Sequence, residues 1–144
     1  MSEQTGSAAN GVMVVEDVRK EYPDTGEVLR GVSFELAPGH SMSIVGPSGS
    51  GKSTLLNILG SLDTPTSGSV RLGATVVSSL DGAALAEYRA RRVGFVFQDH
   101  HLLPQCTALE NALLPTLALG GAVAHTVEWA RDLLERVGLS LIHI

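Results

Sequence analysis

The sequence contains few of the residues that mark secreted or membrane-spanning proteins. It has a single cysteine, Cys106, among 144 residues, so an internal disulfide bond is impossible and a reducing compartment is suitable. No basic head followed by an apolar run stands at the N-terminus, so no secretory signal is expected. The longest apolar stretch, residues 112–124, is interrupted by Pro115 and is too short to cross a bilayer. Any association with a membrane should therefore come through a partner protein.

Positive charge and aromatic side chains are scarce as well. Lys and Arg number 10 against 15 Asp and Glu, and the net charge of −5 disfavours bulk binding to nucleic acid or to an anionic membrane surface. Aromatic residues make up only 4% of the chain, but hydrophobic residues make up 44%, which is enough aliphatic material for a packed core. The length fits one domain, and an ordered protein is expected.

The first part of the chain has the pattern of an antiparallel sheet. Residues 12–18 are β-branched and strand-like, and residues 28–36 form a second strand candidate that ends before a Pro-Gly pair. Between them, residues 22–27 carry Pro, Asp and Gly, which indicates a turn. A further strand is predicted over residues 69–72.

Later segments alternate short apolar runs with helical periodicity. Residues 41–45 and 93–97 are the two apolar runs, and each predicts a buried strand. The predicted helices cover residues 52–62, a segment from a capping Asp81 to about residue 92, residues 108–119, and residues 124–137 before Gly138. The order of elements is therefore β-rich, then β-α-β, then helical.

A glycine-rich loop follows the first of the two apolar runs. Residues 46–53, Gly-Pro-Ser-Gly-Ser-Gly-Lys-Ser, fit the phosphate-binding pattern G-x-x-x-x-G-K-[ST]. Three glycines allow backbone angles at which successive N–H groups point inward around a phosphate. The helix that begins near Lys52 adds unpaired N–H groups and the positive end of its dipole. An ordinary glycine-rich turn is the alternative, but the preceding strand and the following amphipathic helix favour a phosphate site.

Two side chains at the end of this loop have specific chemistry. Lys52 supplies a full positive charge where the outer phosphates of a nucleotide would lie. Ser53 offers a hydroxyl group to Mg²⁺, which prefers hard oxygen ligands. The loop therefore predicts a nucleotide site.

Three other stretches narrow the class of nucleotide-binding protein. They are VRKEYPDTGEVLRGVSFELAPG before the loop, LGSLDTPTSGSVRLGATVV after its helix, and RVGFVFQDHHLLPQCTALENALLP further along. Their succession resembles the ATP-binding subunits of ABC transporters, in the branch that includes lipoprotein-releasing and macrolide-export ATPases. This resemblance runs from about residue 12 to about residue 138, nearly the whole chain.

The resemblance implies an α/β fold: a P-loop NTPase core with an antiparallel β subdomain and the start of a helical subdomain, apparently truncated. The expected organisation is a flexible tail over residues 1–10, an incomplete ATP-binding domain over residues 11–138, and a divergent tail over residues 139–144.

The resemblance also implies a set of site residues for ATP and Mg²⁺. Tyr22 matches the aromatic residue that stacks on adenine, and the alternative is a tyrosine in a surface turn. Gln98 matches the Q-loop glutamine that reaches Mg²⁺ and the attacking water, although it could merely end a buried strand. Lys52 and Gln98 are then catalytic, and Ser53 and Gln98 contact the metal. The nucleotide-binding set is Tyr22, Gly46, Pro47, Ser48, Gly49, Ser50, Gly51, Lys52, Ser53 and Thr54.

Partners follow from the same resemblance. It implies a homodimer that sandwiches two ATP molecules, and an integral-membrane permease contacted by the loop near His100 and His101. The protein would then be cytoplasmic and peripheral on the inner face of the cell membrane, with no nucleic acid partner. Adjacent histidines also raise the alternative of a metal site, but no cysteine or acidic cluster accompanies them.

Parts of the family pattern for hydrolysis are not found in this sequence. The family uses an apolar strand that ends in Asp-Glu, an LSGGQ-type signature and a late switch histidine. Residues 12–17 precede the loop and carry the two acids in the wrong order, and residues 117–121 lack the serine and the glutamine. His143 lacks the preceding strand and acids. The hypothesis is an incomplete reading frame whose product binds ATP, dissolves poorly and hydrolyses little on its own.

Three functions remain open from sequence. The first is the ATP-binding and ATP-hydrolysing subunit that powers export or lipoprotein release. A small P-loop kinase or GTPase would need a phosphate-acceptor pocket or a guanine-reading motif such as N-K-x-D, and neither is found. A non-catalytic ATP-binding regulatory or assembly module is the third, since the phosphate loop is present and the catalytic base is not.

Overall fold

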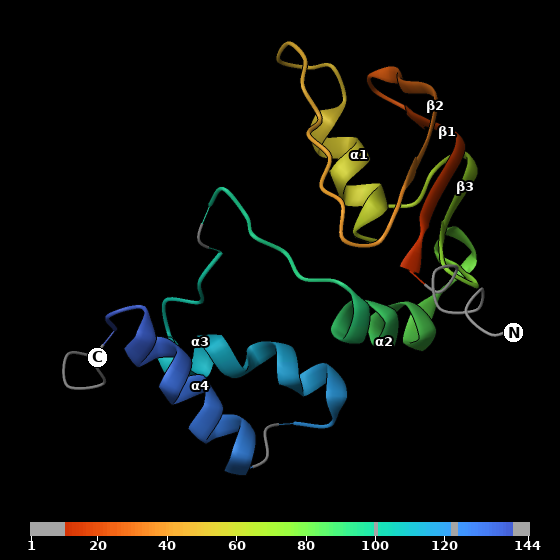
Figure 1. Ribbon diagram of the computed structural model, residues 1–144. Helices are drawn as coiled ribbons and strands as arrows, with labels where there is room; N and C mark the ends of the chain where they lie inside the picture. Colours follow the sequence, from red (N-terminus) through yellow and green to blue (C-terminus); the bar gives the residue numbers. More distant parts are fainter. Residues whose placement is uncertain (1–10, 100, 122–123, 140–144) are drawn as a thin grey trace, which may run out of the picture. The chain divides into compact units, whose positions relative to one another are not determined.

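The computed structural model describes residues 11–99, 101–121 and 124–139. The chain divides into two units, Met1–Leu85 and Ala86–Ile144, and each is described by itself (Figure 1). The boundary falls within helix α2 (Gly82–Arg92).

The first unit is built on an antiparallel sheet. Its strands are β1 (Met13–Tyr22), β2 (Gly26–Leu36), β3 (Ser67–Leu72) and β4 (Thr75–Val76), in the order β2-β1-β3-β4. β1 pairs with β2 from Met13↔Leu36 to Tyr22↔Gly26, and Met13 also pairs with Leu72 of β3. The predicted antiparallel pair, its turn and the strand over residues 69–72 are confirmed. A short 3-10 helix, η2 (Val77–Ser79), follows β4.

Aliphatic side chains of the sheet form the core of this unit. The buried set comprises Val14, Val15 and Val18 of β1, Leu29 of β2, Val70 of β3 and Val77 of η2, joined by Leu55 and Ile58 of helix α1 (Lys52–Leu59). α1 contacts β2. Because β-branched residues suit a pleated surface, the valines that predicted strands also fill the interior.

A bulge interrupts the pairing of β1. The register shifts between Val15 and Val18 against β2, and between Glu16 and Arg19 against β3. Asp17 takes a left-handed backbone angle, φ 44°, and its N–H donates to the Ser33 hydroxyl at 2.9 Å. Bulges bend a strand and increase its local twist, so the bulge redirects the end of β1 that carries Tyr22.

Helix α1 ends in a turn whose left-handed residue is Ser61 rather than a glycine. Ser61 has φ 60°, the Leu62 N–H donates to the Asn57 carbonyl at 2.8 Å, and the Ser61 N–H donates to the Ile58 carbonyl at 3.0 Å. These two bonds form a Schellman motif, which satisfies the last carbonyls of a helix. The helix predicted over residues 52–62 is thus confirmed and stops slightly earlier.

The second unit contains α3 (Ala108–Leu113), the 3-10 helix η3 (Leu114–Leu119) and α4 (Ala124–Arg136). The single helix predicted over residues 108–119 is wrong, because the α-helix gives way to a 3-10 helix at Leu114, the residue before Pro115. Proline lacks an N–H and its ring crowds the carbonyl one turn back, so an α-helix does not continue through it. α4 confirms the predicted last helix, and Gly138, with φ 82°, ends it in a Schellman motif.

One amide organises the loop before α3. The Asn111 side-chain oxygen accepts from the Leu103 N–H at 2.8 Å, and its NH₂ group donates to the carbonyls of Leu103, Cys106 and Thr107 at 3.0–3.1 Å. Thr107 and Glu110 form a capping box at the start of the helix. The helix therefore holds its own leading loop in place.

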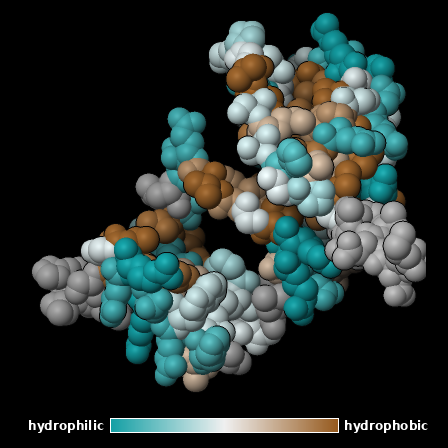
Figure 2. All heavy atoms as spheres, in the orientation of Figure 1, coloured by the Kyte–Doolittle hydropathy of each residue, from teal (hydrophilic) through white to brown (hydrophobic). Residues whose placement is uncertain are grey.

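The two buried strands predicted over residues 41–45 and 93–97 are wrong. Neither segment forms a strand, and their side chains are largely exposed: Val45 is 86% and Val96 101% exposed. A buried parallel strand needs a hydrogen-bonded neighbour and cover on both faces. Within the described ranges the paired strands are β1 to β4, so these two segments have no ladder to join. Figure 2 shows that hydrophobic residues are exposed among hydrophilic ones on the visible face of each unit.

None of the helices in the described part of the chain has the length and apolar character needed to cross a bilayer.

Gly68 of β3 provides a test of the bulge. Its φ is +86°, and a Cβ there would collide with the carbonyl oxygens of Glu16 and Asp17. We expect Gly68→Ala to lower the free energy of unfolding by about 2–4 kcal/mol, since backbone strain and a backbone collision add. Urea unfolding followed by circular dichroism measures it.

Gly39 is the matched control. It has φ +76° but nothing within 4 Å of the Cβ position, so Gly39→Ala should cost only the left-handed strain, about 1–2 kcal/mol. Equal losses for the two variants would contradict the tight contact between β3 and the bulge.

Candidate phosphate-binding site

The glycine-rich loop leads directly into helix α1. Gly51 is the N-cap residue, with φ 84° and ψ 8°, and its carbonyl accepts the Leu55 N–H at 2.8 Å, which opens the helix. The Ser50 N–H donates to the Pro47 carbonyl at 3.3 Å and tightens the loop. The first N–H groups of the helix have no intrahelical partner, and they gather at the loop.

Gly51 is needed for packing as well as for its backbone angle. A Cβ at this position would lie 2.8 Å from Leu29 Cδ2 and 3.1 Å from the Val28 carbonyl oxygen of β2. Only a residue without a side chain lets the loop approach the sheet this closely. The start of α1 is therefore positioned by β2.

A cavity of about 240 Å³ opens at the start of α1. It is lined by Val28, Ser48, Gly49, Gly51, Lys52, Ser53 and Thr54. The charged member of this lining is Lys52, and its charge adds to the positive end of the helix dipole. Hydroxyl groups of serine and threonine supply polar contacts. The site is suited to an anion such as a phosphate group.

The Lys52 side chain folds back over the loop. Its Nζ donates to the Pro47 carbonyl at 2.6 Å. Gly46 lies against Ser50, since a Cβ on Gly46 would be 2.8 Å from the Ser50 hydroxyl oxygen. The structure thus brings the eight loop residues and Thr54 into one compact region. Ser53, the predicted Mg²⁺ contact, lines the cavity, and its hydroxyl has the chemistry for that role.

Tyr22 belongs to a polar cluster at the end of β1. Its hydroxyl donates to Asp63 Oδ2 at 2.7 Å, and Lys20 Nζ donates to Asp63 Oδ1 at 2.6 Å and to the Thr64 carbonyl at 2.7 Å. The same ammonium group lies 4.8 Å from the centroid of the Tyr22 ring, a cation–π geometry. The sequence indicated Tyr22 but not its two partners.

The cluster shifts the ionisation of its members. The hydrogen bond to the Asp63 carboxylate raises the pKa of Tyr22, and partial burial acts in the same direction. Partial burial alone would raise the pKa of Asp63, but hydrogen bonds from Lys20, Tyr22 and the Thr64 N–H outweigh it and lower that pKa. Asp63 is therefore an anion at neutral pH and accepts both bonds. The Thr54 side chain, which also lines the cavity, acts in the opposite direction on the pKa of Tyr22 and lowers it.

The remaining predicted site residues lie in the second unit or outside the described residues. Gln98 is exposed and belongs to the second unit, so its approach to the loop stays a prediction. His100 lies outside the described residues. His101 is exposed, with its ring edge-on to Phe97 at 4.7 Å between centroids. Among the described residues, no group of three His, Cys, Asp or Glu side chains is placed to hold a metal ion.

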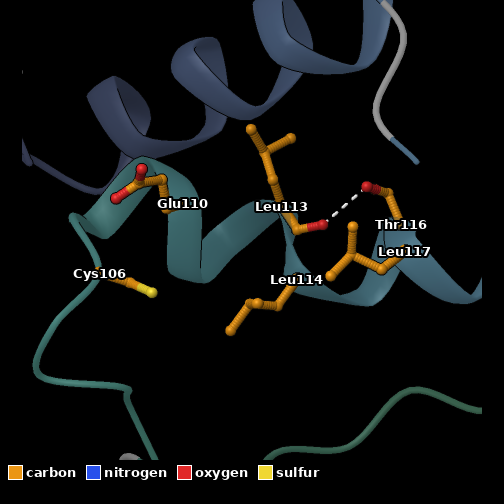
Figure 3. Close-up of a pocket in the computed structure, with 6 residues that line it drawn as sticks. All are labelled: Cys106, Glu110, Leu113, Leu114, Thr116 and Leu117. Atoms are coloured by element: carbon orange, nitrogen blue, oxygen red, sulfur yellow. Dashed lines mark hydrogen bonds between the residues drawn. The ribbon is translucent and has the colours of Figure 1, made fainter.

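A slightly larger cavity in the second unit has the wrong chemistry for phosphate. It measures about 260 Å³ and is lined by Cys106, Glu110, Leu113, Leu114, Thr116 and Leu117 (Figure 3). Hydrogen bonds from the Thr107 N–H and hydroxyl lower the pKa of Glu110, so this lining carries a negative charge. The Thr116 hydroxyl donates its hydrogen to the Leu113 carbonyl at 2.7 Å, so it is not available as a donor to a phosphate. Cavity volume alone would favour this cavity as the phosphate site, whereas the charge of the lining favours the cavity at the glycine-rich loop.

Comparison with known proteins identifies the family of the chain. The family described as ABC transporter matches residues 29–143. The chain belongs to the ABC transporter family. The family resemblance and the fold class drawn from the sequence are thereby confirmed.

Individual relatives in this family are close in sequence. The chain is 52% identical over 132 residues to the lipoprotein-releasing system ATP-binding protein LolD 1 of Rhodopirellula baltica, covering 90% of this chain and 58% of that protein. It is 48% identical over 135 residues to LolD of Geobacter metallireducens, covering 91% and 60%. The chain therefore spans about three-fifths of the length of these relatives.

A solved structure shares the fold. The dimeric structure of a post-hydrolysis state of the ATP-binding cassette MJ0796 bound to ADP and Pi matches with a TM-score of 0.79 and 37% identity. The match covers 90% of this chain and 59% of that one.

The Tyr22–Asp63 hydrogen bond can be tested by titration. The chain has 2 tyrosines, so a Tyr88→Phe background leaves Tyr22 as the one phenol that titrates in ultraviolet difference spectra. Adding Asp63→Asn removes the negative charge that opposes ionisation, so the pKa of Tyr22 should fall toward its ordinary value of about 10. An unchanged or raised pKa would contradict the bond.

Proposed function

We propose that this protein is the ATP-binding and ATP-hydrolysing subunit that powers an ABC transporter, in lipoprotein release or export. The observation that carries the proposal is the cavity at the start of α1, lined by the glycine-rich loop and Lys52. Two findings support it: the family to which the chain belongs, and its identity of about half to proteins named as lipoprotein-releasing ATP-binding proteins.

In this proposal each part of the site has one task. Main-chain N–H groups of residues 48–53 and the dipole of α1 hold the phosphates, and Lys52 exchanges its bond to Pro47 for the outer phosphates. Ser53 contacts Mg²⁺, which neutralises phosphate charge during transfer. Tyr22 stacks on adenine, since a flat π-face suits a flat base. Gln98 contacts Mg²⁺ and the attacking water.

The proposal includes two protein partners. One is a second copy of the subunit, supported by the dimeric state of the related cassette MJ0796. The other is an integral-membrane permease, contacted through the loop near His100 and His101, which would hold the protein on the cytoplasmic face of the membrane. The helix α3 and its Asn111-bound leading loop follow this segment and would form a firm support for such a contact.

A non-catalytic ATP-binding regulatory or assembly module is the second candidate, because the cavity at the start of α1 supplies phosphate-binding groups that both functions need. An ATPase assay with and without a candidate membrane subunit separates the two. Release of phosphate that rises with the subunit supports hydrolysis, and ATP binding without release supports the module.

Lys52→Ala tests the phosphate site directly. The variant leaves phosphate charge poorly compensated, so ATP affinity should weaken by about 2–5 kcal/mol. Titration with a fluorescent ATP analogue in the presence of Mg²⁺ measures it. Arg30→Ala is the matched control, because Arg30 is a cation on β2 whose side chain is 79% exposed. Unchanged binding by Lys52→Ala, or equal weakening in both variants, would refute the site.

A further inference from the structure

The Asp63 carboxylate joins the ends of two elements. It lies in the turn after α1, whereas Tyr22 and Lys20 belong to the end of β1. Each of its oxygens is used, one by the Tyr22 hydroxyl at 2.7 Å and the other by Lys20 Nζ at 2.6 Å. The Lys20 and Asp63 side chains are only 11% and 25% exposed, so water screens this pair less than a surface salt bridge.

These contacts fix the orientation of the Tyr22 ring. The hydroxyl is held at one end, and the ammonium group lies over one face, 4.8 Å from the centroid. A ring with both constraints loses little further freedom when a second flat group stacks on its opposite face. The Thr64 carbonyl, which also accepts from Lys20 Nζ at 2.7 Å, keeps the ammonium group in place.

We propose that Asp63 is a positioning residue for base recognition: it orients Tyr22 for stacking on adenine and holds Lys20 against the other face of the ring. The inference rests on the proposed ATP site and goes further, because it assigns a role to a residue that touches neither phosphate nor metal. The competing explanation is that Asp63 only stabilises the turn after α1, in which case its loss would affect every ligand of the loop alike.

Two ligands separate these explanations. ATP carries both base and phosphates, whereas tripolyphosphate with Mg²⁺ carries phosphates alone. Asp63→Ala should weaken ATP binding about 5- to 20-fold, the effect of losing one charge-assisted hydrogen bond. Tripolyphosphate affinity should stay within about twofold, since the loop is untouched. Isothermal titration on the full chain measures both.

Three further variants complete the experiment. Tyr22→Phe keeps the ring but removes the hydroxyl, so it should weaken ATP binding to a similar extent, and Asp63→Ala added to it should cost little more. Asp63→Asn keeps an oxygen acceptor and should restore part of the affinity; with Tyr22→Phe it decides the question even if Asp63→Ala fails to fold. Asp24→Ala removes an exposed carboxylate near Tyr22 and should change neither ligand.

The outcomes that overturn the inference differ from those that overturn the ATP site. Equal weakening of ATP and tripolyphosphate by Asp63→Ala, or additive losses with Tyr22→Phe, would show a merely structural Asp63 and leave the ATP site intact. A wild-type chain that binds both ligands equally would exclude stacking while keeping the phosphate site. A chain that binds neither would overturn the proposed function itself.

Discussion

The close contact between Gly51 and β2 is the constraint on which the site depends. The loop can reach the sheet only where no side chain intervenes, and a Cβ on Gly51 would meet both Leu29 and the Val28 backbone. Leu29 is itself buried in the valine core of the sheet. β2 pairs with β1 along its length. The start of α1, which packs against β2, is therefore held in a fixed position by the sheet.

Charge then decides what this position can bind. The cavity at α1 combines an ammonium group with unpaired N–H groups, whereas the slightly larger cavity beside α3 carries the Glu110 carboxylate and leucines. The Lys20–Asp63–Tyr22 cluster joins the turn that follows the same α1 to the end of β1, as the Gly51 contact joins the start of α1 to β2. One helix and two paired strands therefore hold every part of the proposed site that the first unit contains.

The local sequence pattern was sufficient to predict the elements of this unit whose contacts come from neighbouring residues. Two strands joined by a tight turn, and a helix preceded by a phosphate loop, are specified by neighbouring residues, and both were predicted. The strands predicted over residues 41–45 and 93–97 were wrong because an apolar run indicates only a tendency to be buried. Whether such a run forms a buried strand depends on neighbouring strands from other parts of the sequence. Pro115 lies inside the helix predicted over residues 108–119, and its missing N–H ends the α-helical bonding that apolar spacing alone predicts.

Polar contacts between residues far apart in the chain could not be predicted from the sequence either. Asp63 and Lys20 are 43 residues apart, and no spacing rule connects them. Asp63 looked like one polar residue of a turn, and only the fold shows that its carboxylate faces Tyr22. The register of the β1 bulge belongs to the same class, because it depends on Gly68 in another strand.

The central claim is that main-chain N–H groups of the loop bind the phosphates. The most direct measurement is the change in amide ¹H and ¹⁵N chemical shifts when Mg²⁺-ATP is added to the full chain. The account predicts the largest changes at the amides of Gly49, Gly51, Lys52 and Ser53. Unmoved loop amides, with the largest changes instead among residues 106–117, would contradict it.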